Sequence, residues 1–383
     1  MVRYWRRLST SCMIVLAAAG AGAAAEYETP KNRLAKDVLP AAVAAGADYT
    51  VGDPVVSDGY MYQFKVKSPY VVFDVTGTGA LRKLEREIWA IGQLKQVTKS
   101  EAFLKSLKDQ AGKPLVFAKD VVTKPGETLS GIPKGVGRLF SNASTAITNT
   151  KDPSQESAAR ELLLVGSFKR DYAARFEVDP YSSNPVLQGA VTSLSKSFNN
   201  VLANEPPSRI RVINEEELGQ MGIAPDLAKR YLDHPVFTPR QDLLLVDSLH
   251  RLGAATGRDA DLNAARAAAD EVEANFFVNM AQILRGYHEK QGPITGITMV
   301  GPLTVAQTKS GAAMIPFALD YGVWTENAER LSQELKATYR APGFTGGFEL
   351  WVTGTLSPQG KQELQARGFT VVEQVGGRID IVD

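Results

Sequence analysis

Residues 294–319 read ITGITMVGPLTVAQTKSGAAMIPFAL, and this stretch decides how the C-terminal part of the chain folds. Short apolar runs rich in Ile, Val and Thr are typical of strands in a largely buried sheet. Gly301-Pro302 and Ser310-Gly311 separate the runs, as turn-forming residues do. The strands predicted from this pattern cover Ile294–Val300, Leu303–Gln307 and Ala312–Leu319.

Helices and further strands follow this predicted sheet in alternation. Thr325 opens a helix that ends near Tyr339, and Ser357-Pro358 opens another that runs to Arg367. The order predicts a small α/β domain over residues 293–383. The strands expected around the two helices are Phe348–Val352, Phe369–Val375 and, after a Gly376-Gly377 turn, Ile379–Val382.

The preceding part of the chain, residues 126–292, is predicted to form a mostly helical domain. Asp152–Gln155 and Thr238–Gln241 each combine a capping residue, a proline at the next position and a glutamine at the third. This combination is a helix-start signature. We expect a similar cap at Asn214–Glu217, and a single long amphipathic helix over residues 259–290.

The N-terminal region, residues 26–125, is predicted to contain a β-hairpin and a helix. Tyr60–Lys67 and Tyr70–Val75 have the alternating pattern of paired strands. Apolar residues then recur at three- and four-residue spacing from Leu81 to Leu94, which indicates a helix. Together these segments predict a helix-rich α+β protein with an N-terminal hairpin, a helical middle and a small C-terminal α/β domain.

The first 25 residues have the three parts of a secretory signal peptide. Arg3, Arg6 and Arg7 form a basic start, an apolar stretch follows, and small residues precede an expected cleavage near Ala25. A retained membrane anchor is the alternative, but the apolar run is shorter than the roughly 20 residues needed to span a bilayer. The sequence therefore predicts a periplasmic or secreted protein.

Composition excludes several classes of function for the mature chain. The 383 residues include 43 Lys and Arg against 42 Asp and Glu, a balance that argues against a dedicated nucleic-acid-binding protein. Cys12 is the only cysteine and lies in the predicted signal peptide. The mature chain would then lack disulfides, zinc–thiolate sites and cysteine nucleophiles.

A basic amphipathic segment is the first candidate binding surface. The segment from Arg82 to Arg138 contains twelve Lys and Arg residues and six Asp and Glu residues. An apolar stripe beside basic residues suits an interfacial helix on an anionic membrane, or a partner-binding surface. The alternative is a helix that buries its stripe in the protein's own core. The candidate residues are Ile132, Lys134, Val136, Arg138, Leu139 and Phe140.

No complete catalytic or metal-binding constellation is visible in the sequence, so catalytic residues stay unassigned and no metal or cofactor is expected. His234, His250 and His288 are too far apart to form a two-histidine metal motif, and G-x-S-x-G is absent. Ser182-Ser183-Asn184 could be a serine-rich site turn. Its simpler role is to cap the helix that begins at Pro185.

A second, weaker candidate site lies in the C-terminal domain. Asp320, Tyr321 and Trp324 follow one predicted strand, and Thr353 follows another. Ligands of open α/β sheets bind beyond the carboxyl ends of strands, so these four residues could line a shallow pocket. The simpler interpretation is a buried tryptophan pair with Asp320 as a local cap.

These observations lead to an expected function. We expect an exported bacterial envelope protein of non-enzymatic type, which docks to an anionic membrane surface or to an envelope protein. The alternative is a periplasmic hydrolase or a small-ligand-binding enzyme with its site in residues 293–383. The sequence predicts no nucleic-acid partner and leaves the oligomeric state open.

Overall fold

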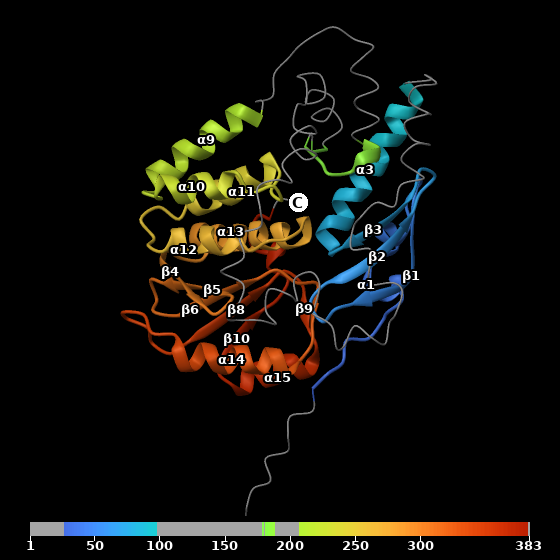
Figure 1. Ribbon diagram of the computed structural model, residues 1–383. Helices are drawn as coiled ribbons and strands as arrows, with labels where there is room; N and C mark the ends of the chain where they lie inside the picture. The colour runs from blue at the N-terminus through green and yellow to red at the C-terminus, as the bar shows by residue number, and fades with distance from the viewer. Residues whose placement is uncertain (1–26, 98–177, 180, 188–206, 382–383) are drawn as a thin grey trace, which may run out of the picture.

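The computed structural model describes residues 27–97, 178–179, 181–187 and 207–381. The predicted fold class is confirmed: the protein is a helix-rich α+β protein with an N-terminal sheet and a larger C-terminal sheet. Figure 1 shows the N-terminal sheet with α3 on one side of the molecule and a layered body on the other. Within these ranges, no helix combines the length and apolarity needed to cross a membrane.

Residues 27–97, together with 178–179 and 181–187, form what we call the N-terminal unit. Its three strands lie antiparallel in the order β1-β2-β3. The side chains of Tyr62, Phe64 and Val66 on β2 are buried in one core with the apolar face of α3. The elements are α1 (Ala35–Val38), α2 (Ala41–Ala44), β1 (Thr50–Ser57), β2 (Tyr62–Lys67), β3 (Val72–Thr76) and α3 (Thr78–Val97).

The predicted hairpin is the β2–β3 pair, and its register continues without a bulge from Gln63 opposite Thr76 to Lys67 opposite Val72. Strand β1 was not predicted. Gly52 and Pro54 interrupt its apolar pattern, and the pairing with β2 shifts register at this point. Gly and Pro weaken the strand signal of a single sequence, because neither residue favours the interior of a strand.

Residues 207–381 form the C-terminal body, which begins with five helices. One hydrophobic core runs through these helices and the sheet that follows them, so the helices and the sheet stabilise each other. The boundary predicted between residues 292 and 293 stays a prediction. The helices are α9 (Pro207–Gln220), α10 (Pro225–Leu232), α11 (Pro239–His250), α12 (Arg258–Ala265) and α13 (Glu271–Lys290).

Two helix predictions in this region were wrong. The expected long helix over residues 259–290 is two helices, because the Asp270 side chain accepts a hydrogen bond from the Glu273 amide (2.9 Å) and starts α13. Asn214 does not cap a helix but lies in the middle of α9, which starts at Pro207. In both cases a local cap pattern competed with a longer helical pattern, and packing decided between them.

The C-terminal sheet has the order β10-β8-β6-β5-β4, with β10, β8 and β6 parallel. Strands β4 and β8 have the predicted bounds. In Figure 1, α14 and α15 cover one face of the sheet and α13 covers the other. The elements are β4 (Ile294–Val300), β5 (Leu303–Thr308), β6 (Ala313–Phe317), α14 (Glu326–Thr338), β8 (Phe348–Val352), α15 (Pro358–Ala366) and β10 (Phe369–Val372), with a short β7 (Tyr321–Gly322) paired to β9 (Thr355–Leu356).

The predicted final strand, Ile379–Val382, was wrong over the residues that the structure describes. A 3₁₀ turn at Val375–Gly377 replaces the expected hairpin turn, and Gln374 before it has a φ of 53°. Ile379 is buried and packs against Gly286 of α13, where a Cβ atom would lie 2.5 Å from that of Ile379. The apolar residues that suggested a strand therefore cover a helix.

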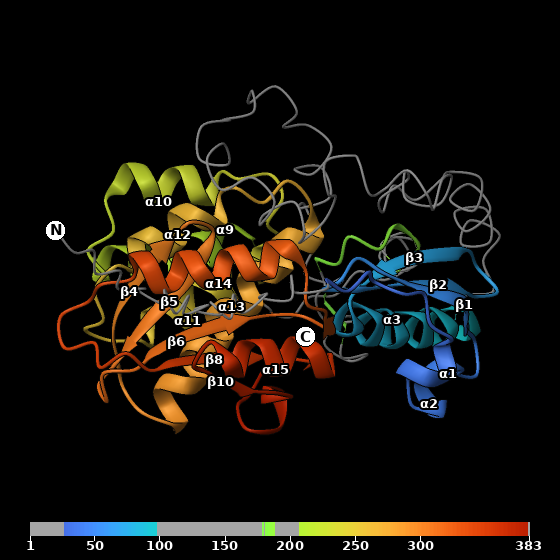
Figure 2. The same ribbon diagram turned by 90° about the horizontal axis from the view of Figure 1, so that it is seen from below.

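The N-terminal unit joins the C-terminal body at the carboxyl end of β6. The Asp320 carboxylate accepts hydrogen bonds from the backbone amides of Tyr62 (2.9 Å) and Thr78 (3.0 Å). The Tyr60 carbonyl accepts hydrogen bonds from the amides of Asp320 and Tyr321. Figure 2 shows the small sheet and α3 beside the layered body. This junction places β3 and α3 near the start of α13.

Candidate functional site

A cleft lies between the N-terminal unit and the first residues of α13. It is a half-open cleft with a cavity volume of about 70 Å³, lined by β3, the first half of α3, residues 182–184 and the start of α13. Ligand sites occur preferentially at such junctions between two cores. The apolar part of its wall consists of Phe73, Val75, Ala80, Leu84 and Val272.

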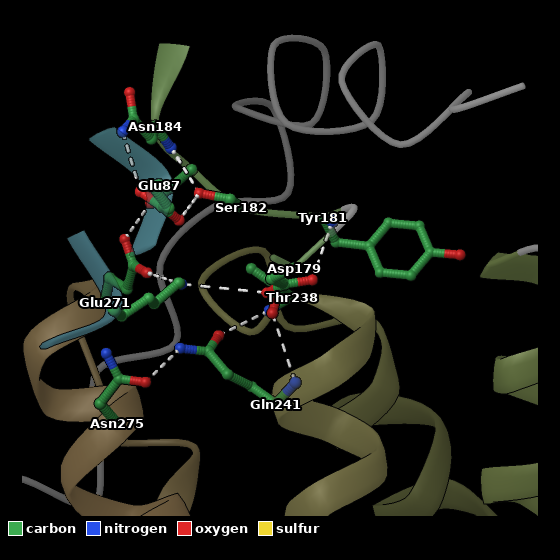
Figure 3. Close-up of polar contacts among 11 residues, drawn as sticks. Glu87, Asp179, Tyr181, Ser182, Asn184, Thr238, Gln241, Glu271 and Asn275 are labelled. Carbon is green, nitrogen blue, oxygen red and sulfur yellow. Dashed lines mark hydrogen bonds and ion pairs between the residues drawn. The ribbon is translucent and has the colours of Figure 1, made fainter. Parts of the chain in front are cut away.

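The polar part of the wall is built around the buried carboxylate of Glu87, which is 3% exposed. The Ser182 hydroxyl donates a hydrogen bond to Oε1 (2.5 Å), and the Asn184 amide donates one to Oε2 (2.8 Å). Figure 3 shows both side chains pointing toward this carboxylate. Each oxygen of Glu87 therefore has a partner, as a buried charged group requires.

Local geometry explains how the described residues of this segment, 178–179 and 181–187, present these side chains. Asp179 accepts a hydrogen bond from the Tyr181 amide (2.8 Å), which bends the chain into an Asx turn. Oδ1 of Asn184 accepts from the amides of Val186 (3.1 Å) and Leu187 (3.3 Å). The predicted cap at Asn184 is confirmed, and the same side chain also binds Glu87 through its amide group.

Lys83 and Glu271 form a second contact across the cleft. The Lys83 ammonium lies 3.5 Å from Oε1 of Glu271 and 3.9 Å from Oδ2 of Asp179. The Ser183 hydroxyl donates to the other oxygen of Glu271 (2.5 Å). Glu271 is the first residue of α13, where the helix dipole favours a carboxylate. The cleft thus connects three separate parts of the chain through charged and hydrogen-bonded groups.

Burial and neighbouring charges act in opposite directions on these groups. Burial raises the pKa of the Glu87 carboxyl, and the nearby ammonium and the two hydrogen-bond donors act against this rise. Burial also raises the pKa of Asp179. At Lys83 burial opposes the charged form, but the surrounding carboxylates outweigh it and raise the pKa. Lys83 therefore stays charged and stabilises the carboxylates around it.

A hydrogen-bond chain supports the α13 side of the cleft from α11. Thr238 and Gln241 form the predicted capping box at the start of α11, with the Thr238 amide donating to the Gln241 side chain (2.8 Å). The Gln241 amide group then donates to Oδ1 of Asn275 (2.7 Å), which lines the cleft. Figure 3 shows this chain below the Glu87 contacts. One wall is therefore held by two helices.

The arrangement permits binding and, in principle, serine chemistry. A serine hydroxyl that donates to a carboxylate has the geometry of a nucleophile beside a base. Over the described ranges, no group of three or more His, Cys, Asp or Glu could hold a metal ion. The histidines do not line the cleft: Nδ1 of His288 accepts from the Ile294 amide (3.1 Å), and His250 lies 3.8 Å from Glu217.

The four residues of the predicted C-terminal site lie beyond the carboxyl ends of β6 and β8. Asp320 binds backbone amides of the N-terminal unit, and the Tyr321 ring stacks on Tyr62 at 6.4 Å. Thr353 donates to the Leu319 carbonyl (2.6 Å). Trp324 is buried, with the Arg367 guanidinium 4.5 Å from its ring centre. The structure brings these residues into structural contacts, and ligand binding by them stays a prediction.

The predicted membrane- or partner-binding residues fall outside the described residues. Ile132, Lys134, Val136, Arg138, Leu139 and Phe140 therefore keep their status as a prediction. The predicted signal peptide, residues 1–25, also lies outside the described ranges.

Sequence reasoning did not single out Lys83, Glu87 or Glu271. A signal for Glu87 was present, because it lies three residues after Leu84 and four before Ile91, on the apolar stripe of α3. A charged residue on a buried stripe needs partners, so it points to a polar site or an ion pair. Its partners, however, come from segments distant in sequence.

Comparisons with protein-family models, curated proteins and solved structures find no match for this chain. The function must therefore be inferred from the geometry of the cleft. That geometry combines an apolar wall, a charged and fully hydrogen-bonded end, and support from two separate cores.

Proposed function

We propose that this chain is an exported envelope protein that binds a protein partner in the cleft between the N-terminal unit and α13. The observation that carries this proposal is the cleft itself, with apolar walls next to charged groups. Protein interfaces combine apolar anchors with polar contacts in the same way. Export is supported by the basic, apolar and small-residue parts of the first 25 residues.

The fixed geometry of the cleft supports binding. The charged groups at its end are held by partners on α3, α13 and residues 179–184. A preformed surface loses little conformational entropy on association, which favours affinity. Since the walls come from two cores, a partner that fills the cleft would also stabilise the junction between them.

Site-specific photo-crosslinking in producing cells tests this proposal. A photo-reactive amino acid would replace Val272 in the cleft wall or, as the control, Gln365 on the exposed side of α15. We expect a discrete protein adduct from position 272 that is absent from position 365. The same adducts from both positions, or none from position 272, would contradict the proposal.

A hydrolase is the second candidate, and the Ser182–Glu87 hydrogen bond of 2.5 Å is the observation that favours it. Ser182 would act as the nucleophile and Glu87 as the base. A fluorophosphonate probe tests this candidate directly. A hydrolase would be labelled, and the labelling would be lost in Ser182→Ala and kept in Ser183→Ala. No labelling of the folded wild-type chain would favour binding over catalysis.

A further inference from the structure

The outer edge of β3 has no strand partner within the ranges that the structure describes. Strand β3 (Val72–Thr76) is the last strand in the order β1-β2-β3 and pairs only with β2. Its five residues contain no proline and no bulge, and one charged residue, Asp74. Proteins usually protect such edges with charges, prolines or bulges, because an open edge can pair with another strand.

The hydrogen bonds at the two ends of the β2–β3 pair show which backbone groups face outward. The Gly77 amide donates to the Tyr62 carbonyl (2.8 Å), and the Ser68 amide donates to the Val71 carbonyl (3.2 Å). Hydrogen-bonded positions alternate along an antiparallel pair. The backbone N–H and C=O groups of Phe73 and Val75 therefore point toward β2. The N–H and C=O groups of Val72, Asp74 and Thr76 point away from it.

Two of the three residues with outward groups border the cleft, whereas Val72 is 50% exposed. Asp74 and Thr76 line it, together with Phe73 and Val75. No described residue supplies a hydrogen bond to the outward groups of Asp74 or Thr76. A strand of five residues is about 16 Å long, which matches a short extended peptide. Among the residues that the structure describes, the backbone donors and acceptors of Asp74 and Thr76 thus have no hydrogen-bond partner along this side of the cleft.

The charge of the lining residues indicates which peptide would fit. Asp74, Glu87 and Glu271 carry three carboxylates, against the ammonium of Lys83 and that of Lys65, which pairs with Asp74 (2.9 Å), so one negative charge is in excess. A segment with a lysine or arginine side chain therefore complements the cleft better than an acidic one. Apolar side chains on the same face of the segment would contact Leu84 and Val272.

We infer that an extended, basic segment of the partner protein pairs with the outer edge of β3 as a fourth strand. This inference rests on the proposed function and specifies how the partner is recognised. Backbone hydrogen bonds to Asp74 and Thr76 supply affinity, and the alternating side chains that enter the cleft supply specificity. The partner's basic side chain lies toward the carboxylates around Lys83.

The first experiment is an N-methyl scan. Ten-residue peptides displayed on phage are selected on the purified protein, and the tightest one is synthesised with a single N-methyl group at each position in turn. We expect a loss of affinity of about tenfold at alternate positions and little change between them, because only every second amide faces β3. Uniform effects, or no selected peptide, would overturn strand addition.

The same peptide separates this inference from the proposed function. If it blocks the adduct at position 272 but shows no period of two, the cleft binds a partner in another way and strand addition is wrong. If position 272 gives no adduct and no peptide is selected, both proposals are wrong. If binding has a period of two but prefers acidic peptides, the inferred charge of the partner is wrong.

Asp74→Pro provides a variant that acts on the edge alone. Proline removes the outward N–H of residue 74 and no hydrogen bond to β2, so the sheet can remain intact. Asp74→Ala is the matched control, since it also loses the ion pair with Lys65 (2.9 Å) but keeps the N–H. We expect binding about tenfold weaker in the proline variant than in the alanine variant.

Hydrogen exchange shows whether the edge is open in the free protein and does not depend on how any variant folds. The amides of Asp74 and Thr76 should exchange faster than those of Phe73 and Val75, and should slow when the peptide binds. Slow exchange at Asp74 and Thr76 in the free protein would mean that this chain or a second copy covers the edge. That result would overturn the inference.

Discussion

This protein contains two sets of buried polar residues, and they differ in how many of their side-chain atoms have a hydrogen-bond partner. In the cleft cluster, defined as Lys83, Glu87, Ser182, Asn184 and Glu271, the Glu87 carboxylate has a donor on each oxygen. In the helix-layer group, defined as Asn214, Tyr231 and Asp242 on α9, α10 and α11, neither polar atom of the Asn214 side chain has a partner among the described residues. Asn214 is nevertheless only 1% exposed.

The difference shows what each cluster contributes to the molecule. The cleft cluster joins three segments, so its hydrogen bonds fix the geometry of a binding wall. The residues of the helix-layer group lie on neighbouring helices that already pack through apolar residues. Burial raises the pKa of Asp242 to about 8, so the carboxyl is mostly neutral near pH 7. The first cluster is organised around a charge, and the second avoids one.

Among the variants that test this comparison, removal of the Glu87 carboxylate should lower the stability most. In Glu87→Ala, Ser182 and Asn184 lose their acceptor and Lys83 loses a nearby carboxylate. Breaking a buried charged network from one side costs about 3–5 kcal/mol. We expect thermal unfolding about 10 °C lower than in wild type. Arg86→Ala on the exposed face of α3 is the control and should change the midpoint little. A small shift in Glu87→Ala would show that the cluster does not hold the wall together.

The pH dependence of stability tests the helix-layer group. The folded pKa of Asp242 lies above its unfolded value of about 4, so its contribution to stability falls as pH rises from about 4 to about 8. The slope is at most about 1.4 kcal/mol per pH unit. Asp242→Asn stays neutral, so the variant should gain up to about 4 kcal/mol relative to wild type between pH 5 and pH 8.

Urea unfolding of wild type and Asp242→Asn at pH 5, 6.5 and 8 measures this difference. Asp58 and Asp261, whose pKa values burial raises to about 6, titrate in both proteins and cancel in the comparison. A gap that stays constant with pH would show that Asp242 is ionised in the folded state.

The same substitution at two asparagines should have opposite effects in the two clusters. Asn184→Leu removes a helix cap and leaves Oε2 of Glu87 without a donor, which costs about 2–4 kcal/mol. Asn214→Leu replaces a buried amide that has no described partner, so it should be neutral or stabilise by about 1 kcal/mol. Chemical denaturation of both variants measures whether the free energy of unfolding falls or rises in each. A large loss of stability in Asn214→Leu would show that the Asn214 amide has a hydrogen-bond partner.

Loss of the hydrogen bonds that support the cleft from α11 should have the smallest effect on stability. Thr238→Ala removes the capping side chain of the box that positions Gln241 and, through it, Asn275. The expected loss is about 1 kcal/mol, or roughly 3 °C in the unfolding midpoint. Thr338→Ala in the last turn of α14, where the exposed hydroxyl donates to the Glu334 carbonyl of its own helix, is a matched control with a smaller expected effect.

Local signals in the sequence predicted most of the regular structure correctly. The bounds of β4 and β8 follow from short apolar runs between turn residues, and the caps at Thr238, Asn184 and Thr325 follow from side chains that bond the nearest amides. Such features need only a few neighbouring residues. The predictions were wrong at Asp270 and Asn214, where a local cap pattern competed with a longer helical pattern. They were also wrong at Ile379, whose contact with Gly286 of α13 places it against a helix and not in a strand.

The sequence by itself determined the α+β class, the positions of most strands and helices, and the polar turn at Ser182-Ser183-Asn184. Only the tertiary structure decided that Glu87 meets this turn, that Lys83 faces Glu271, and that the edge of β3 borders the cleft. The physical reason is range. Capping and periodicity act between residues a few positions apart, whereas Glu87 and Ser182 are separated by 95 positions and meet only when two cores pack together.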